Sequence, residues 1–202
     1  MRPVLIAGNL VEAQLAARTD TQLPQATVEL THSRGPLLAE ALPSAAIDWA
    51  TALTAYALPE QQPYPRIYAG LSGLLDAVEA APTAAGWAEA LVRFELLLLA
   101  ELGFGLDLSR CAVSGRTEEL AAVSPRSGRA ISAAEAAPYA GRLLTLPPFI
   151  LTEVPASWAD TLDGLALTGH FLARDVLDTR ADLLLAARDR LVDRLRRAAG
   201  LA

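Results

Sequence analysis

The sequence predicts a mainly α-helical protein of the α+β class, in which a helical domain follows a short β-rich segment. Apolar residues recur at helical spacing between residues 37 and 102. Strand-like segments are confined to residues 4–30 and to one later hairpin. Of the 202 residues, 52% are hydrophobic and 20% are charged, which is typical of a chain with a large buried core and not of a disordered one.

The first segment contains three predicted strands. They cover residues 4–6, 10–15 and 26–30, with turns at 8–9 and 19–24. Two or three strands do not form a stable sheet by themselves. We therefore expect this segment to need partners.

Three helices are predicted between residues 37 and 102. The first two cover residues 37–58 and 65–80, and Gly103 is suited to end the third. The apolar positions of the third helix, which follow one another at intervals of three or four residues, are Trp87, Leu91, Phe94, Leu98 and Leu102. We expect this helix to be a buried column at the centre of the protein.

The second half begins with an irregular region over residues 106–156. It contains one predicted β-hairpin, whose strands 121–124 and 130–131 flank a turn that carries Arg126 and Arg129. A serine or threonine followed three residues later by an acidic residue predicts the start of a helix. Such pairs are Ser132 with Glu135, Ser157 with Asp160, and Thr179 with Asp182.

Several kinds of site are excluded by composition and spacing. One cysteine, Cys111, allows no disulfide framework and no multi-cysteine metal site. No apolar run approaches the roughly 20 residues of a membrane span, so we expect a cytoplasmic protein with no membrane contact. His32 and His170 lack the spacing of a metal or nucleophile site, and we interpret His170 as a packed, hydrogen-bonded residue. We expect no enzyme, no metal and no cofactor, unless residues 106–156 build a pocket for a small molecule.

The charge is unevenly distributed. All 17 basic residues are arginines, and residues 37–107 carry a net charge of −7. Contacts with a polyanion are therefore expected near the N-terminus or in the second half, where the arginines of the last helix form either a solvated face or a contact surface. The candidates are Arg2, Arg110, Arg116, Arg126, Arg129, Arg194 and Arg197.

Arg93 differs from these residues because it lies in the most apolar helix. Glu89 is one turn before it, and the two can form an i,i+4 ion pair. An arginine at the rim of an apolar groove would also suit a peptide that ends in a carboxylate. Both interpretations stay open, and the candidate partner-binding residues are Arg93, Phe94 and Leu97.

Several stretches of the chain, taken in order, resemble the RecO family of bacterial recombination mediators in its alphaproteobacterial form. They are residues 93–111, 123–130, 143–149 and 168–172, together with 2–5 and 8–12. The resemblance covers nearly the whole chain. It implies a non-enzymatic DNA repair protein that binds and anneals single-stranded DNA. It also implies contact with the C-terminal tail of single-strand-binding protein, and action with RecR to load RecA, so that the RecA filament is an indirect partner. The expected location is the cytoplasm, at the nucleoid.

The resemblance also implies an N-terminal OB-fold barrel followed by a helical domain. Residues 1–34 are expected to be the C-terminal part of an incomplete OB-fold, because residues 2–4 resemble the middle of the family's barrel. Residues 35–202 are expected to be the helical domain, with a hairpin insertion at about 108–150. Either the true start lies upstream of Met1, which we favour, or the protein is a helical partner-binding adaptor that has lost DNA annealing.

Some members of the family carry a zinc module with paired cysteines at this insertion. Cys111 matches the first of these cysteines, Ser114 stands in place of the second, and the later pair is absent. One thiol does not hold a tetrahedral zinc ion. We therefore expect a hairpin that is held by packing and lacks zinc ligands.

Overall fold

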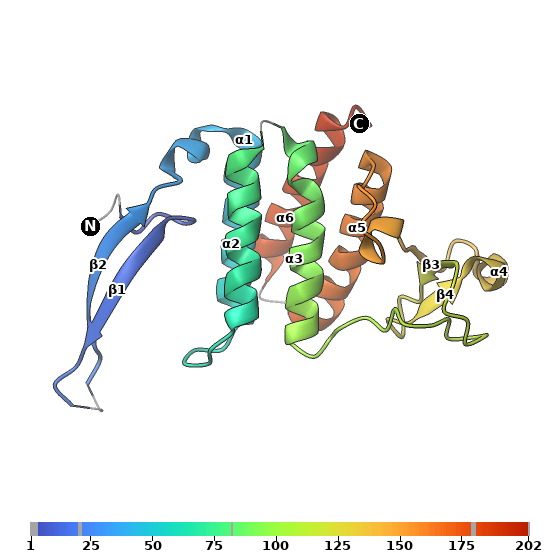
Figure 1. Cartoon of the computed structure of the whole chain (residues 1–202), viewed down its shortest axis with the longest axis horizontal. Coiled ribbons are helices and arrows are strands. Elements are labelled where there is room, and N and C mark those ends of the chain that lie inside the picture. The colour runs from blue at the N-terminus through green and yellow to red at the C-terminus, as the bar shows by residue number, and fades with distance from the viewer. Residues whose placement is uncertain (1–3, 20–21, 82, 179–180, 202) are drawn as a thin grey trace.

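A computed structural model describes residues 4–19, 22–81, 83–178 and 181–201. Figure 1 shows a bundle of helices with a β-hairpin at one end and a small sheet at the other. The helices are α1 (Ala41–Ala57), α2 (Pro65–Ala80), α3 (Ala88–Glu101), the short α4 (Ala133–Ala136), α5 (Trp158–Phe171) and α6 (Asp182–Ala198). The strands are β1 (Leu10–Ala16), β2 (Gln25–His32), β3 (Leu120–Val123), β4 (Ala130–Ser132) and β5 (Leu144–Thr145). No helix in the described part of the chain combines the length and the apolar character needed to cross a bilayer.

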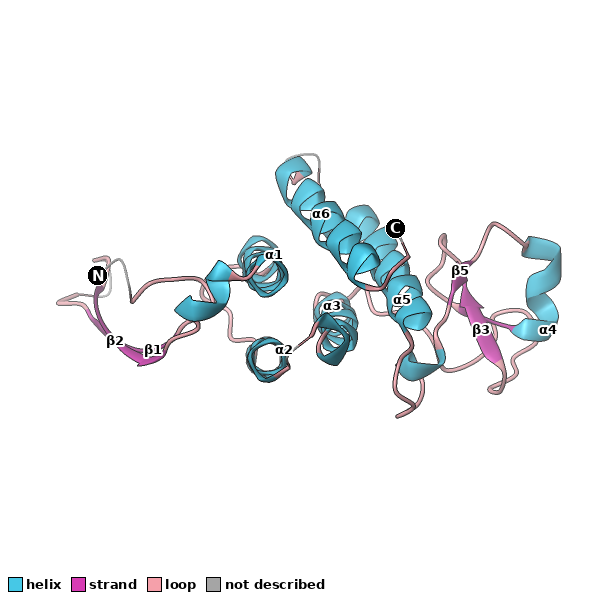
Figure 2. Cartoon of the chain, turned by 90° about the horizontal axis from the view of Figure 1, so that it is seen from above, coloured by secondary structure: helices cyan, strands magenta, loops and turns pink. Residues whose placement is uncertain are grey.

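Helix α3 lies between α2 and α5, and Figure 2 shows the long helices gathered around it. Trp87, Leu91 and Leu98 are each at most 1% exposed, and Phe94 is 2% exposed. Each such side chain contributes about 1.5–3 kcal/mol when it leaves water. The predicted buried column is confirmed as far as Leu98, while Leu102 is half-buried.

Strands β1 and β2 form an antiparallel hairpin, and no other strand of the described residues pairs with it. One face is apolar, because Val11 lies opposite Leu30, Ala13 opposite Val28 and Leu15 opposite Ala26. This face is mostly open to solvent, with Leu15 69% exposed. The two longer predicted strands are confirmed. The prediction of a strand over residues 4–6 is wrong, because turns occupy this segment and lead to Gly8 at a φ of 85°.

Arg34 fastens the hairpin to the bundle. Its side chain is 7% exposed, ion-pairs with Asp76, and donates from Nε to Glu79 Oε2 at 3.1 Å. It also donates from Nη1 to the carbonyl oxygen of Gly8 at 2.8 Å. The hairpin is therefore held at its base by charges on α2 and not by a shared core.

Residues 107–146, which we call the sheet module, form a three-stranded sheet in the order β4-β3-β5. The predicted hairpin of β3 and β4 is confirmed, while β5 has only two residues and no recognisable pattern. A π-helical extension of α5, Leu172–Val176, holds the tip of this hairpin. Arg174 Nη1 donates to the carbonyl oxygens of Pro125 and Arg126, and His170 Nε2 lies 3.0 Å from that of Pro125. His170 is thus a packed, hydrogen-bonded residue, as predicted.

The predicted helix starts have different outcomes. Ser157 and Asp160 form the expected reciprocal capping box, with the Asp160 N–H 3.1 Å from Ser157 Oγ. Helix α4 begins directly after Ser132, as predicted, but the capping box is absent, because Ser132 Oγ is buried without a partner among the described residues. Thr179 lies outside the described residues, and the N-cap of α6 is Ala181, without a side-chain cap.

Candidate functional site

A buried ion pair lies where four helices meet. Glu95 of α3 is fully buried and Arg188 of α6 is 6% exposed. Arg188 donates from Nε and Nη2 to the two Glu95 carboxylate oxygens, at 2.9 and 2.7 Å. This bidentate arrangement is the strongest form of an arginine–carboxylate pair.

The remaining two helices complete the hydrogen bonding of the pair. Trp49 of α1 donates from Nε1 to Glu95 Oε1 at 2.8 Å, and Thr168 of α5 donates to Glu95 Oε2. The next residue of α5 must be glycine, because a Cβ at Gly169 would lie 2.3 Å from Arg188 Nη1. We call Trp49, Glu95, Thr168 and Arg188 the polar cluster.

The polar cluster is a structural element and not an acid–base site. Burial acts to lower the pKa of the Arg188 guanidinium, but the Glu95 charge and its hydrogen bonds outweigh burial and raise that pKa. Arg188 therefore stays charged, and the cluster joins α1, α3, α5 and α6 around one carboxylate.

The prediction that the arginines of the last helix form a solvated face or a contact surface is therefore wrong for Arg188, which is buried. The spacing of the apolar residues around Arg188 explains why it is buried. Arg188 follows Leu184 by four residues and precedes Leu191 by three, so it lies on the apolar face of α6. An arginine on such a face requires a buried acid.

Four of the predicted arginines lie in the sheet module, and all four are exposed. In the described structure, the guanidinium groups of Arg110, Arg116 and Arg126 are exposed and make no hydrogen bond or ion pair. Arg129 lies 3.5 Å from Asp107. Hydrogen bonds from Ser109, with a smaller effect of the Arg129 charge, lower the pKa of the Asp107 carboxyl. Three of the four arginines predicted here are thus unpaired cations on one small module.

The other predicted arginines are placed differently. Arg194 donates to the carbonyl oxygen of Ala41 at 2.7 Å, and Arg197 donates to that of Asp193 at 3.3 Å. Both therefore interact with helix ends or backbone. Arg2 lies outside the described residues.

The candidate partner-binding residues do not share one surface. Arg93 ion-pairs with Glu89 at 2.8 Å, as the spacing predicts, and it donates to the Phe149 carbonyl oxygen at 2.8 Å. Phe94 is buried in the core, and Leu97 packs toward α2, where a Cβ at Gly70 would lie 2.5 Å from Leu97 Cδ2. Only Arg93, with a side chain 41% exposed, is open to a partner.

Cys111 does not fit a zinc site. Its thiol is buried and accepts the Ser132 N–H at 3.3 Å. Hydrogen bonds from Ser114 and Ser132 lower its pKa to about 6. Hydrogen-bond donors, and not further metal ligands, thus surround the sulfur. No three His, Cys, Asp or Glu side chains of the described residues gather around a point that a metal could occupy.

The chain is similar to known DNA repair proteins. A family model described as the C terminal of recombination protein O matches residues 42–181. A protein of Rhodospirillum centenum called DNA repair protein RecO is 45% identical over 98% of this chain and 79% of its own length. Proteins of the same name from Gluconacetobacter diazotrophicus and Rhodospirillum rubrum are each 46% identical. These alignments cover 92% and 98% of this chain, and 75% and 80% of those relatives.

Proposed function

The chain belongs to the RecO family of DNA repair proteins, and from this premise we propose that it is a recombination mediator. In this proposal it binds single-stranded DNA and single-strand-binding protein in the cytoplasm, at the nucleoid, and helps RecR to load RecA. Its action is binding and not catalysis. The observation that carries the proposal is the 45% identity along nearly the whole chain.

We propose that the sheet module contacts the DNA backbone. Arg110, Arg116 and Arg126 support this role, since exposed guanidinium groups without partners are available to phosphates. Arg129 adds a fourth charge that is shared with Asp107. Arg194 and Arg197 are weaker candidates because their guanidinium groups are engaged with backbone carbonyls.

We propose that residues 1–34 belong to an OB-fold and that residues 35–202 form the helical domain. The exposed apolar face of the β1–β2 hairpin supports this assignment, because such a face would be buried inside a closed barrel. Arg34, at the boundary, would then fasten the barrel to α2.

Arg93 is the proposed contact for the acidic, apolar-ended tail of single-strand-binding protein. Its guanidinium is partly exposed beside the Phe149 carbonyl. Phe94 is buried and Leu97 is half-buried on the packed side of the same helix. Titration of a tail peptide against the wild type and Arg93→Ala tests this contact. Unchanged affinity would remove Arg93 from the proposed site.

The alternative function is a helical adaptor that binds partners but not DNA. The acidity of residues 37–107 favours it. Fluorescence anisotropy with a labelled DNA single strand, measured at increasing salt, separates the two. A mediator binds with an affinity that falls with salt, with a logarithmic slope of about −0.7 for each phosphate contacted. An adaptor shows no saturable binding at any salt concentration.

A further inference from the structure

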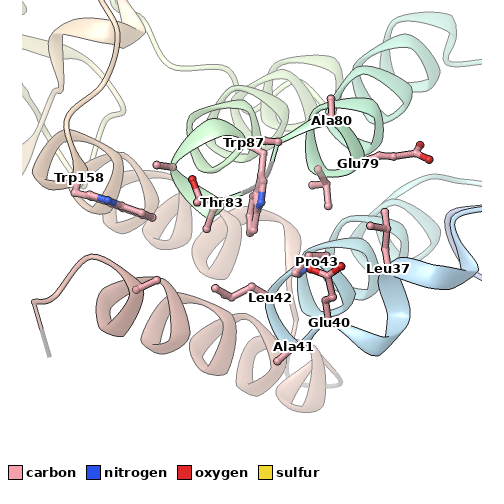
Figure 3. A pocket seen from close by; sticks show the side chains of 15 residues that line it. Leu37, Glu40, Ala41, Leu42, Pro43, Glu79, Ala80, Thr83, Trp87 and Trp158 are labelled. Carbon is pink, nitrogen blue, oxygen red and sulfur yellow. The ribbon is translucent and has the colours of Figure 1, made fainter.

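A groove of 880 Å³ crosses the end of the bundle where α1 begins and α2 ends. Apolar residues that line it include Leu37, Leu42, Val78 and Trp87, and about half of its surface is polar. Figure 3 shows Trp158 toward one end, Glu40 and Glu79 toward the other, and Trp87 between them. We call it the tryptophan groove.

The Trp87 indole N–H is a hydrogen-bond donor without an acceptor. Trp87 is 1% exposed, yet within the described residues its side chain makes no hydrogen bond. Among the described buried polar atoms, only Ser132 Oγ lacks both a partner and contact with solvent. The Trp87 nitrogen therefore reaches solvent, and the groove that its ring lines is the route.

The charge at the other end of the groove is negative. Glu40 is exposed, does not cap α1 with its side chain, and has no ion-pair partner among the described residues. Glu79 is 35% exposed and already binds Arg34 and His32. Residues 37–107, from which most of the lining comes, carry a net charge of −7.

We propose that the tryptophan groove binds a peptide segment of a partner protein that carries a basic side chain next to a large apolar one. The apolar side chain packs against Leu42, Val78 and the indoles. A peptide carbonyl replaces solvent as the acceptor of the Trp87 N–H. The basic group pairs with Glu40.

The same chemistry excludes other occupants. An acidic tail or a nucleic-acid backbone would bring negative charge to Glu40 and Glu79. The groove is therefore distinct from the contacts proposed at Arg93 and on the sheet module, and it does not depend on the proposed function.

The test is a titration of the full chain into short fluorescein-labelled peptides, followed by anisotropy. One peptide alternates leucine with arginine, and the other alternates leucine with glutamate. We expect saturable binding of the arginine peptide only. Glu40→Arg should weaken it about tenfold, because an attractive pair becomes a repulsive one. Glu60→Arg, the same change at an exposed glutamate outside the groove, should leave it within about twofold.

Two further variants test the indole contact. Trp87→Phe keeps an aromatic ring and removes the N–H, and it should weaken the arginine peptide about fivefold. If Trp87→Phe does not fold, Trp158→Ala should instead weaken the arginine peptide about fivefold, because the apolar side chain of the peptide loses one of its two indole contacts. Equal binding of the two peptides, equal effects of Glu40→Arg and Glu60→Arg, or no saturable binding would each overturn the proposal.

Discussion

The helical bundle and its edge bury two arginine side chains, whereas the arginines of the sheet module are all exposed. In and beside the bundle, Arg34 and Arg188 are both 6% exposed and bonded to carboxylates of other elements. In the sheet module, Arg110, Arg116 and Arg126 are exposed, and their guanidinium groups have no partner in the part of the chain that the structure describes. Desolvation explains the difference, because a buried charge is tolerated only when an opposite charge and hydrogen bonds compensate it. Net charge alone therefore does not locate a binding surface in this protein.

The largest expected effect is a loss of stability when the buried acid of the bundle is removed. Glu95→Gln leaves the buried Arg188 charge uncompensated, and we expect a loss of about 3–5 kcal/mol in the free energy of unfolding. Urea denaturation followed by circular dichroism measures it. Glu60→Gln, an exposed glutamate, is the matched control and should stay within about 0.5 kcal/mol. A loss below about 1 kcal/mol for Glu95→Gln would show that the polar cluster does not hold the helices together.

A smaller effect is expected from steric pressure on the same cluster. Gly169→Ala places a Cβ 2.3 Å from Arg188 Nη1 and should cost about 1–3 kcal/mol. Gly73→Ala provides the contrast, since its Cβ meets nothing within 4 Å on α2. That variant should gain about 0.5–1 kcal/mol. Thermal denaturation of both compares them, and two changes of the same sign would contradict the packing described.

The third effect concerns the sheet module and depends on pH. The folded protein lowers the pKa of the Cys111 thiol to about 6, below the ordinary value of about 8.5 in an unfolded chain. The unfolded state therefore binds more protons between these values, so the stability that Cys111 contributes should rise as pH increases from about 6 to about 8.5. Denaturation of the wild type and Cys111→Ala across this range tests the sign. A wild type that loses stability relative to Cys111→Ala over this range would refute the thiolate stabilisation.

The helices were predictable because periodicity and local chemistry determine them. Residues 65–80 were predicted as a helix to the residue, and the Ser157 capping box formed as expected. Ser132 shows the limit of such patterns, because its environment is decided by Cys111, which lies 21 residues away in the sequence.

The polar cluster was not predicted for a similar reason. Its four members come from four helices, and the Glu95–Arg188 pair spans 93 residues. The position of Arg188 on an apolar face was visible in the sequence. The sequence does not show which of the nine acidic residues between 37 and 107 pairs with it. Of the candidate site, the sequence located the arginines of the sheet module, while only the structure separates the unpaired arginines from those held by the fold.

We propose that the unpaired arginines of the sheet module bind phosphate and that the exposed bundle arginines Arg66, Arg190 and Arg196 do not. We therefore compare two triple variants: Arg110, Arg116 and Arg126 changed to alanine, and the exposed Arg66, Arg190 and Arg196 of the bundle changed in the same way. Both lose three charges. The logarithmic slope of single-stranded DNA affinity against salt should fall by about 2 in the first variant, at about 0.7 for each lost contact, and stay unchanged in the second. Equal slopes in the two variants would contradict the claim.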